Sequence, residues 1–351
     1  MRILKRLGAG AALTAAVLVA GPAVAQVNDD PFKQGWAPSE WGADDKAGAV
    51  NRTTPAMVLK AVKLVKQGKT ATLGKVYAHD APAFGSRGWR LTIPGLPTGG
   101  PFGKQQLMYN DDYLATEIGQ IGTQFDGPGH IGVRTSMGMY FYNGQILGKS
   151  GDNAYGMGTL GVEHVAHKGY VCRGVLLDAV ALRGEQLPIP KAAGATGDPG
   201  IITDKDVEQM VKNQGIDPIG EGDCVFLHTG HGNIWHPTDW DKYDAAEKKR
   251  RVAAFNAGEP GFGMSACNYL AERKVILTGA DTWAVEAVPG ESKENPFECH
   301  VQLQTRRGIW NLENMDLTQL VADKAYEFLF VWSPLKIKGG TGSPGNPVAL
   351  Y

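Results

Sequence analysis

Apolar runs separated by Gly, Pro and charged residues recur along the chain, and their spacing predicts both strands and helices. Continuous apolar runs over 174–178, 223–228 and 275–277 predict buried strands, because a strand covered on both faces shows no polar alternation. Late strand material is expected over 301–312 and 326–332. These runs supply the strands of a predicted sheet.

Helix end signals accompany several segments with helical apolar spacing. Thr54-Pro55 begins a helix, with Pro in the first turn, and Gly68 is expected to end it. Thr203 begins another, with Asp206 placed as the acid of a capping box. Two further helices are expected over 241–256 and 264–273.

The connection between the first predicted helix and the central part of the chain is unusually long. A short strand is expected over 70–76, and a Pro- and Gly-rich segment follows over 81–103. Because segments of this length without secondary structure often cover sites, this one is a candidate lid. The aromatic stretch 140–144 is interpreted either as a pocket wall or as core packing.

Composition narrows the class of protein. The 351 residues carry a formal net charge of −1, which argues against a nucleic-acid or anionic-membrane partner. A hydrophobic content of 43% is enough to bury a core, and 47 Gly with 20 Pro favour a loop-rich enzyme containing β-structure. No internal repeat or interdomain linker interrupts the sequence, so we expect a single domain.

The first 25 residues have the pattern of a secretory signal peptide. A basic start precedes the mostly apolar run 11–20, and Ala23-Val24-Ala25 forms a small-x-small cleavage site. A retained membrane anchor is the alternative, but the apolar run is short for a span. The mature chain is therefore expected in the periplasm or outside the cell, with an N-terminal arm over 26–50 and the main domain over 51–351.

The four cysteines suggest neither a zinc site nor a nucleophile. They are Cys172, Cys224, Cys267 and Cys299. No Cys-x-x-Cys pair is present, so a structural zinc ion is not expected. Cys172 and Cys224 lie in apolar strand-like runs and are expected to be buried free thiols, although export permits disulfides and leaves the pairing open.

The most informative stretch is 120–130. Its polar side chains at even spacing are Gln120, Gln124 and Asp126. In an extended strand these would converge on one face, with Gly122 leaving open space between them. The Gly127-Pro128-Gly129 turn then allows His130 to swing back toward the same point. Amide oxygens, a carboxylate and an imidazole at one point suit a metal ion or a polar substrate.

This stretch resembles the signature His-x-Gly-Thr-His-x-Asp-x-Pro-x-His of the metal-dependent cyclase and kynurenine formamidase-like hydrolase family. The matching residues are Gly122, Thr123, Asp126, Pro128 and His130. Gln120 and Gln124 stand in place of the first two histidines, as in a branch similar to trans-dienelactone hydrolase. The resemblance implies an α/β fold with the swivelling β/β/α architecture in one domain.

The resemblance also implies a set of site residues. A late His and a Glu in a Glu-Asn pair complete the metal site in the family, and His300 and Glu313 fit that order; Glu298 is a weaker rival for the late acid. Asp126, His300 and Glu313 would bind one divalent ion, Mn²⁺ or Zn²⁺. Gln120 and Gln124 would be neutral oxygen ligands or would lie just outside the ligands.

The implied reaction is hydrolysis of a cyclic ester or an amide, with a small molecule as the substrate and a homo-oligomer as the assembly. His130 would act as general acid and base, because an imidazole exchanges protons near neutral pH. Two alternatives remain: an arylformamidase resembling kynurenine formamidase, and an exported binding protein without catalysis. The two missing signature histidines keep the second alternative open.

Other motifs in the sequence give weaker evidence about function. His228, His231 and His236 gather in a short segment, but their spacing is neither helical nor that of a strand, so we expect them at a pocket edge. The run 263–267 lacks the last Gly of a serine-hydrolase elbow. No dinucleotide-binding or Walker motif is present.

Overall fold

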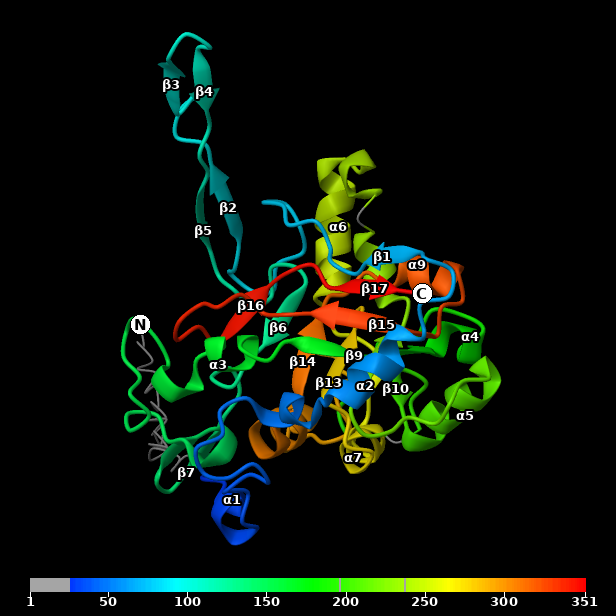
Figure 1. Cartoon of the computed structure of the whole chain (residues 1–351). Coiled ribbons are helices and arrows are strands. Elements are labelled where there is room, and N and C mark those ends of the chain that lie inside the picture. The colour runs from blue at the N-terminus through cyan, green and yellow to red at the C-terminus, as the bar shows by residue number, and fades with distance from the viewer. Residues whose placement is uncertain (1–25, 196, 237) are drawn as a thin grey trace, which may run out of the picture.

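The computed structural model describes residues 26–195, 197–236 and 238–351, so the predicted signal peptide lies outside the described residues. A nine-stranded mixed sheet curls through the middle of the molecule (Figure 1). In spatial order its strands are β1 (Thr70–Thr72), β17 (Val348–Leu350), β15 (Glu327–Trp332), β9 (Tyr170–Asp178), β11 (Cys224–His228), β13 (Leu277–Ala280), β14 (Trp310–Glu313), β6 (Gln124–Asp126) and β16 (Gly342–Pro344). The four strands β9, β11, β13 and β14 are parallel, and the flanking strands pair antiparallel.

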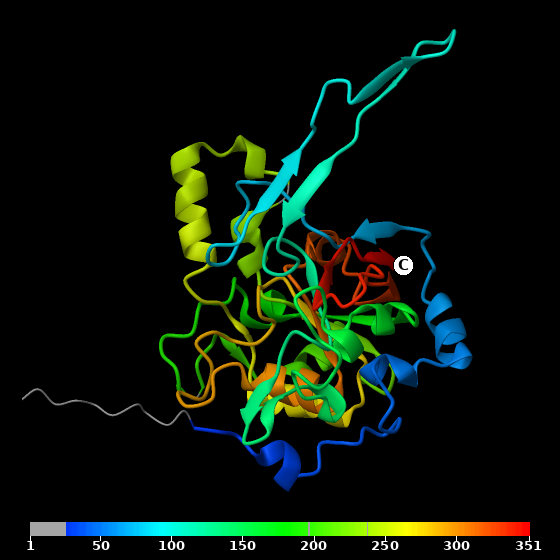
Figure 2. The same cartoon turned by 90° about the vertical axis from the view of Figure 1, so that its left-hand side faces the viewer.

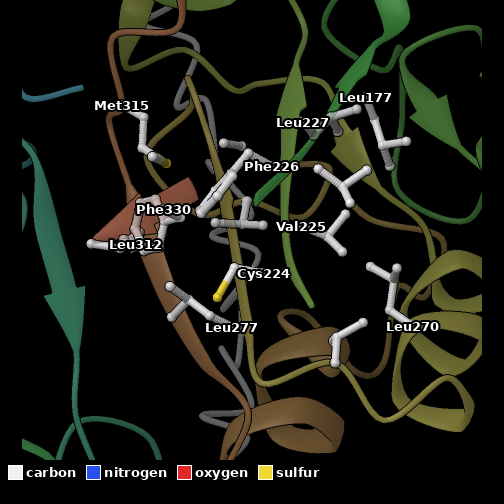
Figure 3. Packing of buried hydrophobic residues seen from close by; sticks show 14 of the residues in the cluster. Leu177, Cys224, Val225, Phe226, Leu227, Leu270, Leu277, Leu312, Met315 and Phe330 are labelled. Carbon is white, nitrogen blue, oxygen red and sulfur yellow. The ribbon is translucent and has the colours of Figure 1, made fainter. Parts of the chain in front are cut away.

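The parallel strands form the core, as their apolar sequences predict. Every residue of β11 is buried, and Val225, Phe226 and Leu227 pack among side chains of neighbouring strands (Figure 3). The Phe226 ring lies 4.7 Å from that of Phe330 on β15. Strands β9, β11 and β13 correspond to the three predicted buried runs, although β13 begins only at Leu277. The predicted α/β fold in one domain is confirmed.

Helices connect the strands and pack against the sheet and against one another. They are α1 (Asp30–Lys33), α2 (Pro55–Val62), α3 (Glu163–Ala166), α4 (Ala179–Arg183), α5 (Asp204–Gln214), α6 (Ala245–Phe255), α7 (Met264–Glu272), α8 (Glu298–His300) and α9 (Thr318–Ala322). Thr203 and Asp206 form the predicted capping box of α5. Thr54 caps α2 as predicted, but α2 ends at Val62 rather than near Gly68, because the next residues continue in tighter i→i−3 turns.

Two segments differ from their sequence predictions. Residues 301–312 were predicted as strand, but 301–305 form a π-helical turn, η6 (Val301–Thr305), and only β14 is extended in that range. The segment 81–103 contains β2 (Trp89–Thr92) and β3 (Gly99–Phe102). These strands pair with β5 (Tyr113–Thr116) and β4 (Leu107–Tyr109). The resulting β-ribbon, residues 89–116, projects from the body (Figures 1 and 2).

Two further small sheets lie outside the central one. Strand β7 (Val133–Thr135) pairs antiparallel with β8 (Gly138–Tyr140), and β10 (Ile201–Ile202) pairs parallel with β12 (Gly261–Phe262). The N-terminal segment packs on the first of these sheets, where the Trp36 ring lies 6.3 Å from that of Tyr140. At Gly48, φ is +74° and a Cβ would collide with the backbone of Gly308, so the segment approaches the body too closely for any other residue.

All four cysteines form disulfides, so the expectation of free thiols at Cys172 and Cys224 is wrong. Cys172 on β9 is bonded to Cys224 on β11, and Cys267 on α7 is bonded to Cys299 on α8. The two strands are adjacent in the sheet, which brings their thiols together; sequence spacing alone does not reveal that adjacency. Among the described residues, no helix is long and apolar enough to cross a membrane.

Candidate metal centre

Two adjacent antiparallel strands supply the acidic side chains of the candidate site. In the pairing of β6 with β14, Glu313 lies opposite Gln124 and Asn311 lies opposite Asp126. Side chains two residues apart on a strand share a face, so Gln124 and Asp126 point to the same side. The site therefore lies where β14 ends and β6 begins.

Asp126, His300 and Glu313 meet at this point. One potential ligand atom from each lies within 4.8 Å of the others, and all three residues are buried. The His300 Nε2 atom is 3.3 Å from Glu313 Oε1 and 3.8 Å from Asp126 Oδ2. The structure thus brings together three residues that are up to 187 positions apart, from 126 to 313. Glu298, the rival acid, is half-buried and lies outside this group.

The two glutamines also reach the site, but not from one strand. Gln124 is on β6, whereas Gln120 precedes the strand in a bend with φ +63°, so the prediction that both extend from one strand is wrong. Their Nε2 atoms nonetheless both donate to Glu313 Oε2, at 2.5 Å from Gln120 and 2.7 Å from Gln124. Gln124 Nε2 also donates to Asp126 Oδ1 at 3.2 Å. The amides hold the carboxylates in place.

The position of Gly122 is not open space as expected. A Cβ on Gly122 would collide with the ring of Tyr77, whose hydroxyl donates to the Thr123 carbonyl. That ring stacks on Trp89 at the base of the β-ribbon, with ring centroids 4.9 Å apart. Glycine at this position therefore admits an aromatic side chain that packs beside the site.

His130 lies beside the three residues at the partly exposed side of the site. Its Nε2 atom is 3.6 Å from Asp126 Oδ1, and its side chain is 29% exposed, against 2% for Asp126. The Gly127-Pro128-Gly129 turn does return the chain, because the His130 amide donates to the Gly127 carbonyl at 3.0 Å. His130 is therefore close to the buried carboxylate and in contact with solvent.

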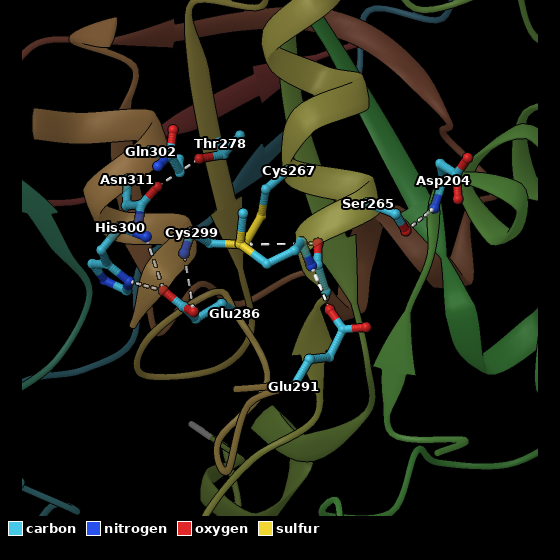
Figure 4. The surroundings of a disulfide bond; sticks show 12 residues. Asp204, Ser265, Cys267, Thr278, Glu286, Glu291, Cys299, His300, Gln302 and Asn311 are labelled. Carbon is cyan, nitrogen blue, oxygen red and sulfur yellow. Dashed lines mark hydrogen bonds and ion pairs between the residues drawn. A yellow bond between two sulfur atoms is a disulfide. The ribbon is translucent and has the colours of Figure 1, made fainter. Parts of the chain in front are cut away.

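Two residues that sequence reasoning missed orient the others. Glu286 accepts a hydrogen bond from the His300 amide at 2.9 Å, and its carboxylate also contacts His300 Nδ1 (Figure 4). Gln304 Nε2 donates to Asp126 Oδ2 at 3.2 Å. Gln304 is four residues after His300, a helical spacing that the sequence offers as a signal. Glu286 stands in no recognisable motif.

Burial and charge set the protonation of the site. Burial, together with the nearby Asp126 carboxylate, raises the pKa of Glu313 to about 8, although His300 acts in the opposite direction. Burial alone would lower the pKa of His300, but its contacts with Glu286 and Glu313 raise that pKa well above the usual value. Crowded buried carboxylates of this kind are stabilised by a positive charge between them.

The donor set fits a divalent cation. Two carboxylates and an imidazole are common ligands of Mn²⁺ and Zn²⁺. Gln120 and Gln304 contact these carboxylates through their Nε2 atoms, and their buried Oε1 atoms have no hydrogen-bond partner among the described residues. The predicted ligands thus lie together, and their assignment as ligands remains a prediction.

The other histidine cluster does not join this site. His228 Nδ1 lies 2.9 Å from Asp178 Oδ1, and His231 Nε2 lies 3.1 Å from the Phe255 carbonyl oxygen. Both side chains are buried in these local contacts. Their spacing in the sequence therefore reflects packing at the ends of strands.

Comparisons with known proteins identify the family of this chain. Residues 53–287 match the model of a family described as putative cyclase. The chain belongs to this cyclase family. Membership makes the protein an enzyme, as the sequence predicts.

A crystal structure described as that of a novel cyclase is 27% identical, with a TM-score of 0.72 and coverage of 93% of this chain and 98% of that one. Isatin hydrolase A from Ralstonia solanacearum is 20% identical, with a TM-score of 0.55 over 85% of this chain and 98% of that one, and supports the fold alone.

An isatin hydrolase of Roseibium aggregatum is 32% identical over 139 residues, or 38% of this chain. That match spans 46%, about half, of the relative's length.

Proposed function

We propose that this cyclase-family enzyme is a metal-dependent hydrolase that opens a cyclic ester or a cyclic amide. The observation that carries the proposal is the buried group of Asp126, His300 and Glu313, whose ligand atoms lie within 4.8 Å of one another. The similarity to an isatin hydrolase supports hydrolysis as the reaction. Isatin is a cyclic amide, and amides and esters present the same kind of carbonyl carbon to water.

Asp126, His300 and Glu313 would hold a single divalent ion, with Mn²⁺ or Zn²⁺ as candidates. When bound, such an ion lowers the pKa of water toward 7 and polarises a carbonyl group. Gln120 and Gln124 stand where the family signature has two histidines, so two imidazole nitrogens that would suit Zn²⁺ are missing, and Mn²⁺ is at least as good a candidate. The amide donors to Glu313 keep that carboxylate aligned.

His130 supplies the proton-transfer group. It is near enough to Asp126, at 3.6 Å, to be oriented by that carboxylate. Its partial exposure lets the ring exchange protons with solvent between turnovers. In this role the imidazole accepts a proton from the attacking water and returns it to the leaving oxygen or nitrogen.

Two resemblances suggest a cyclic substrate. The signature resembles that of the trans-dienelactone hydrolase branch, which suggests a lactone carrying a carboxylate. The relative from Roseibium aggregatum suggests a lactam instead. An arylformamidase and a binding protein without catalysis are the competing functions.

One assay panel separates these functions. Hydrolysis of lactones, isatin and aryl formamides is measured after chelator treatment and after addition of Mn²⁺ or Zn²⁺. We expect metal-dependent opening of a cyclic substrate, at least 100-fold slower for His130→Ala. Turnover confined to aryl formamides would identify an arylformamidase, and no turnover under any condition would favour the binding protein.

Metal analysis tests the site independently of the substrate. Elemental analysis of the purified protein is expected to give at most one tightly bound ion per chain, and Asp126→Asn should remove it. Two stoichiometric zinc ions would contradict the single-ion proposal.

We also propose that the enzyme is exported and acts on a small molecule away from nucleic acids and membranes. The two disulfides support export, because disulfides persist in oxidising compartments. The near-neutral charge argues against a nucleic-acid or anionic-membrane partner.

A further inference from the structure

A cavity of about 380 Å³ lies between the N-terminal arm and the body of the molecule. Its walls come from the arm, from Arg52 at the end of η1 (Gly48–Arg52), from the end of α7, and from residues 306–307 after η6. Among the described residues that line it, none is a proposed metal ligand. Small-molecule sites have volumes of about 300–1,000 Å³, so the cavity can hold a small organic molecule.

The wall that the arm contributes is held firmly on the body. The side-chain amide of buried Asn143 donates to the carbonyls of Gly42 and Asp45, both at 2.9 Å, and its Oδ1 accepts from the Ser39 amide at 2.7 Å. The Tyr142 hydroxyl donates to Asp45 Oδ2 at 2.7 Å. A cavity with walls fixed in this way loses little conformational entropy when a ligand binds.

Positive charge is concentrated around this cavity. The lining has four basic side chains and two acidic ones, a formal charge of +2, although the whole chain carries −1. The basic residues are Arg52, Lys274, Arg306 and Arg307, and the acidic ones are Glu40 and Glu272. Burial and the neighbouring Arg306 lower the pKa of Arg307, although Glu272 acts in the opposite direction. Such a concentration of positive charge attracts an anionic ligand.

Two of the guanidinium groups are stacked on tryptophan rings. The Arg52 group lies 4.8 Å from the centre of the Trp41 ring, and the Arg306 group lies 5.5 Å from that of Trp36. A guanidinium stacked by its face on an aromatic ring keeps its N–H groups at the edge, where they can donate to an acceptor. The tryptophans thus orient the arginine donors without neutralising them.

Arg52 has buried donors that nothing in the described chain satisfies. Its side chain is only 10% exposed, and its Nη2 atom contacts Glu40. The Nε and Nη1 atoms are buried and have no hydrogen-bond partner among the described residues. A buried donor without an acceptor destabilises a protein, so an oxyanion that accepts from this guanidinium would be bound favourably.

The remaining charges indicate how many negative charges the ligand carries. Arg52 pairs with Glu40, and Lys274 lies 4.0 Å from Glu221. In the described part of the chain, Arg306 and Arg307 instead donate to neutral Gln302, at 3.0 Å to its Oε1 atom and 2.7 Å to its carbonyl. Two positive charges at the cavity therefore have no acidic partner.

We propose that this cavity binds a small organic dianion, either a dicarboxylate or a phosphate monoester. Arginine donates two parallel hydrogen bonds to carboxylate and phosphate oxygens alike, so both groups fit the same donors. The binding does not depend on the metal or on the hydrolysis proposed above.

Calorimetric titration of the mature chain with phthalate and with phenyl phosphate tests the proposal. We expect one site per chain for at least one of these dianions, at least about 10-fold tighter than for benzoate and weaker as salt is added. Arg52→Gln and Arg306→Gln should each weaken that binding by at least about 10-fold. The matched control is Arg273→Gln, because Arg273 also stacks on an aromatic ring, that of Tyr269 at 4.8 Å, but does not line the cavity.

The variant Asp126→Asn separates this cavity from the metal centre. It should lose the metal and still bind the dianion as the wild type does. The proposal is overturned if the wild type binds neither dianion, or binds benzoate as tightly. It is also overturned if binding is unchanged in both cavity variants, falls equally in Arg273→Gln, or is lost only in Asp126→Asn, which would place the anion at the metal.

Discussion

At the residue scale, His300 depends on Glu286 for its orientation. Glu286 contacts the Nδ1 side of the ring and the His300 amide, which leaves Nε2 facing Asp126 and Glu313. A carboxylate on the far nitrogen of a ligating histidine fixes the tautomer and makes the ring a better ligand. Glu286 itself sits in a loop held by buried Glu259, which accepts from the Trp283 and Ala284 amides.

The substitution Glu286→Gln should therefore weaken metal binding by about 10- to 100-fold while the fold is retained. The measurement is a calorimetric titration of chelator-treated protein with Mn²⁺ and with Zn²⁺. Glu298→Gln is the matched control, because Glu298 begins α8, the short helix that carries His300, but lies outside the site. Equal dissociation constants for the wild type and both variants would remove Glu286 from this role.

Lys75, which lies outside the proposed set of metal ligands, gives a pH-dependent prediction. Its buried Nζ donates to the carbonyls of Gly232 at 3.0 Å and Trp235 at 2.8 Å. Burial lowers the pKa of Lys75 to about 8, although Asp316 and Asp281 act in the opposite direction. In an unfolded chain that pKa is about 10.4.

Between these two values the unfolded chain binds more protons at Lys75 than the folded chain does. The contribution of this group to stability is therefore full above about pH 10.4 and is lost as the pH falls to about 8. The free energy of unfolding of the wild type relative to Lys75→Met should rise with pH across that window. Urea unfolding of both proteins at several pH values measures the difference, and a pH-independent difference would contradict the assignment.

At the element scale, the short helix α8 carries His300 into the site and is tied to α7 by the Cys267–Cys299 disulfide (Figure 4). The other disulfide, Cys172–Cys224, joins two core strands that already pair along their length. The two bridges thus have different structural consequences, although both close loops of the unfolded chain.

Replacing Cys267 and Cys299 by Ala should lower both stability and metal affinity, because α8 loses its covalent anchor. Replacing Cys172 and Cys224 by Ala is the matched control, and it should lower stability alone. The expected loss of stability is about 2–4 kcal/mol for each pair. Thermal unfolding and metal titration of both variants provide the measurements, and a metal affinity affected equally by the two pairs would refute the anchoring role.

The same elements show what the sequence could reveal. Buried strands such as β11 follow from local apolar runs, and resemblance to a family signature singled out Asp126, His300 and Glu313, which the fold brings together. The bend at Gln120 did not follow, because a left-handed backbone conformation at a glutamine leaves no sequence pattern.

Local sequence patterns did not predict the long-range contacts either. Glu286 reaches the site through a loop fixed elsewhere, and the cysteine pairs depend on which strands and helices become neighbours. The sequence predicts a site-covering loop over 81–103, because the Pro and Gly residues there conceal the short strands β2 and β3.

At the scale of the whole molecule, the pairing of all four cysteines agrees with the proposed export of the chain. Cytosolic thiols are kept reduced, so a chain that relies on two internal disulfides gains its full stability only in an oxidising compartment. The N-terminal 25 residues supply the signal pattern, and Gln26 follows the small-x-small site.

Expression of the full chain in a bacterium should yield a periplasmic protein that begins at Gln26. Under denaturing conditions it should show no reactive thiol before reduction and four after it, in line with the four cysteines. The same chain without residues 1–25 should stay in the cytosol, carry reactive thiols and unfold at a lower temperature, because neither loop is closed. Mass spectrometry and thiol titration measure both forms. If the full chain is recovered from the cytosolic fraction with its first 25 residues uncleaved, export is excluded.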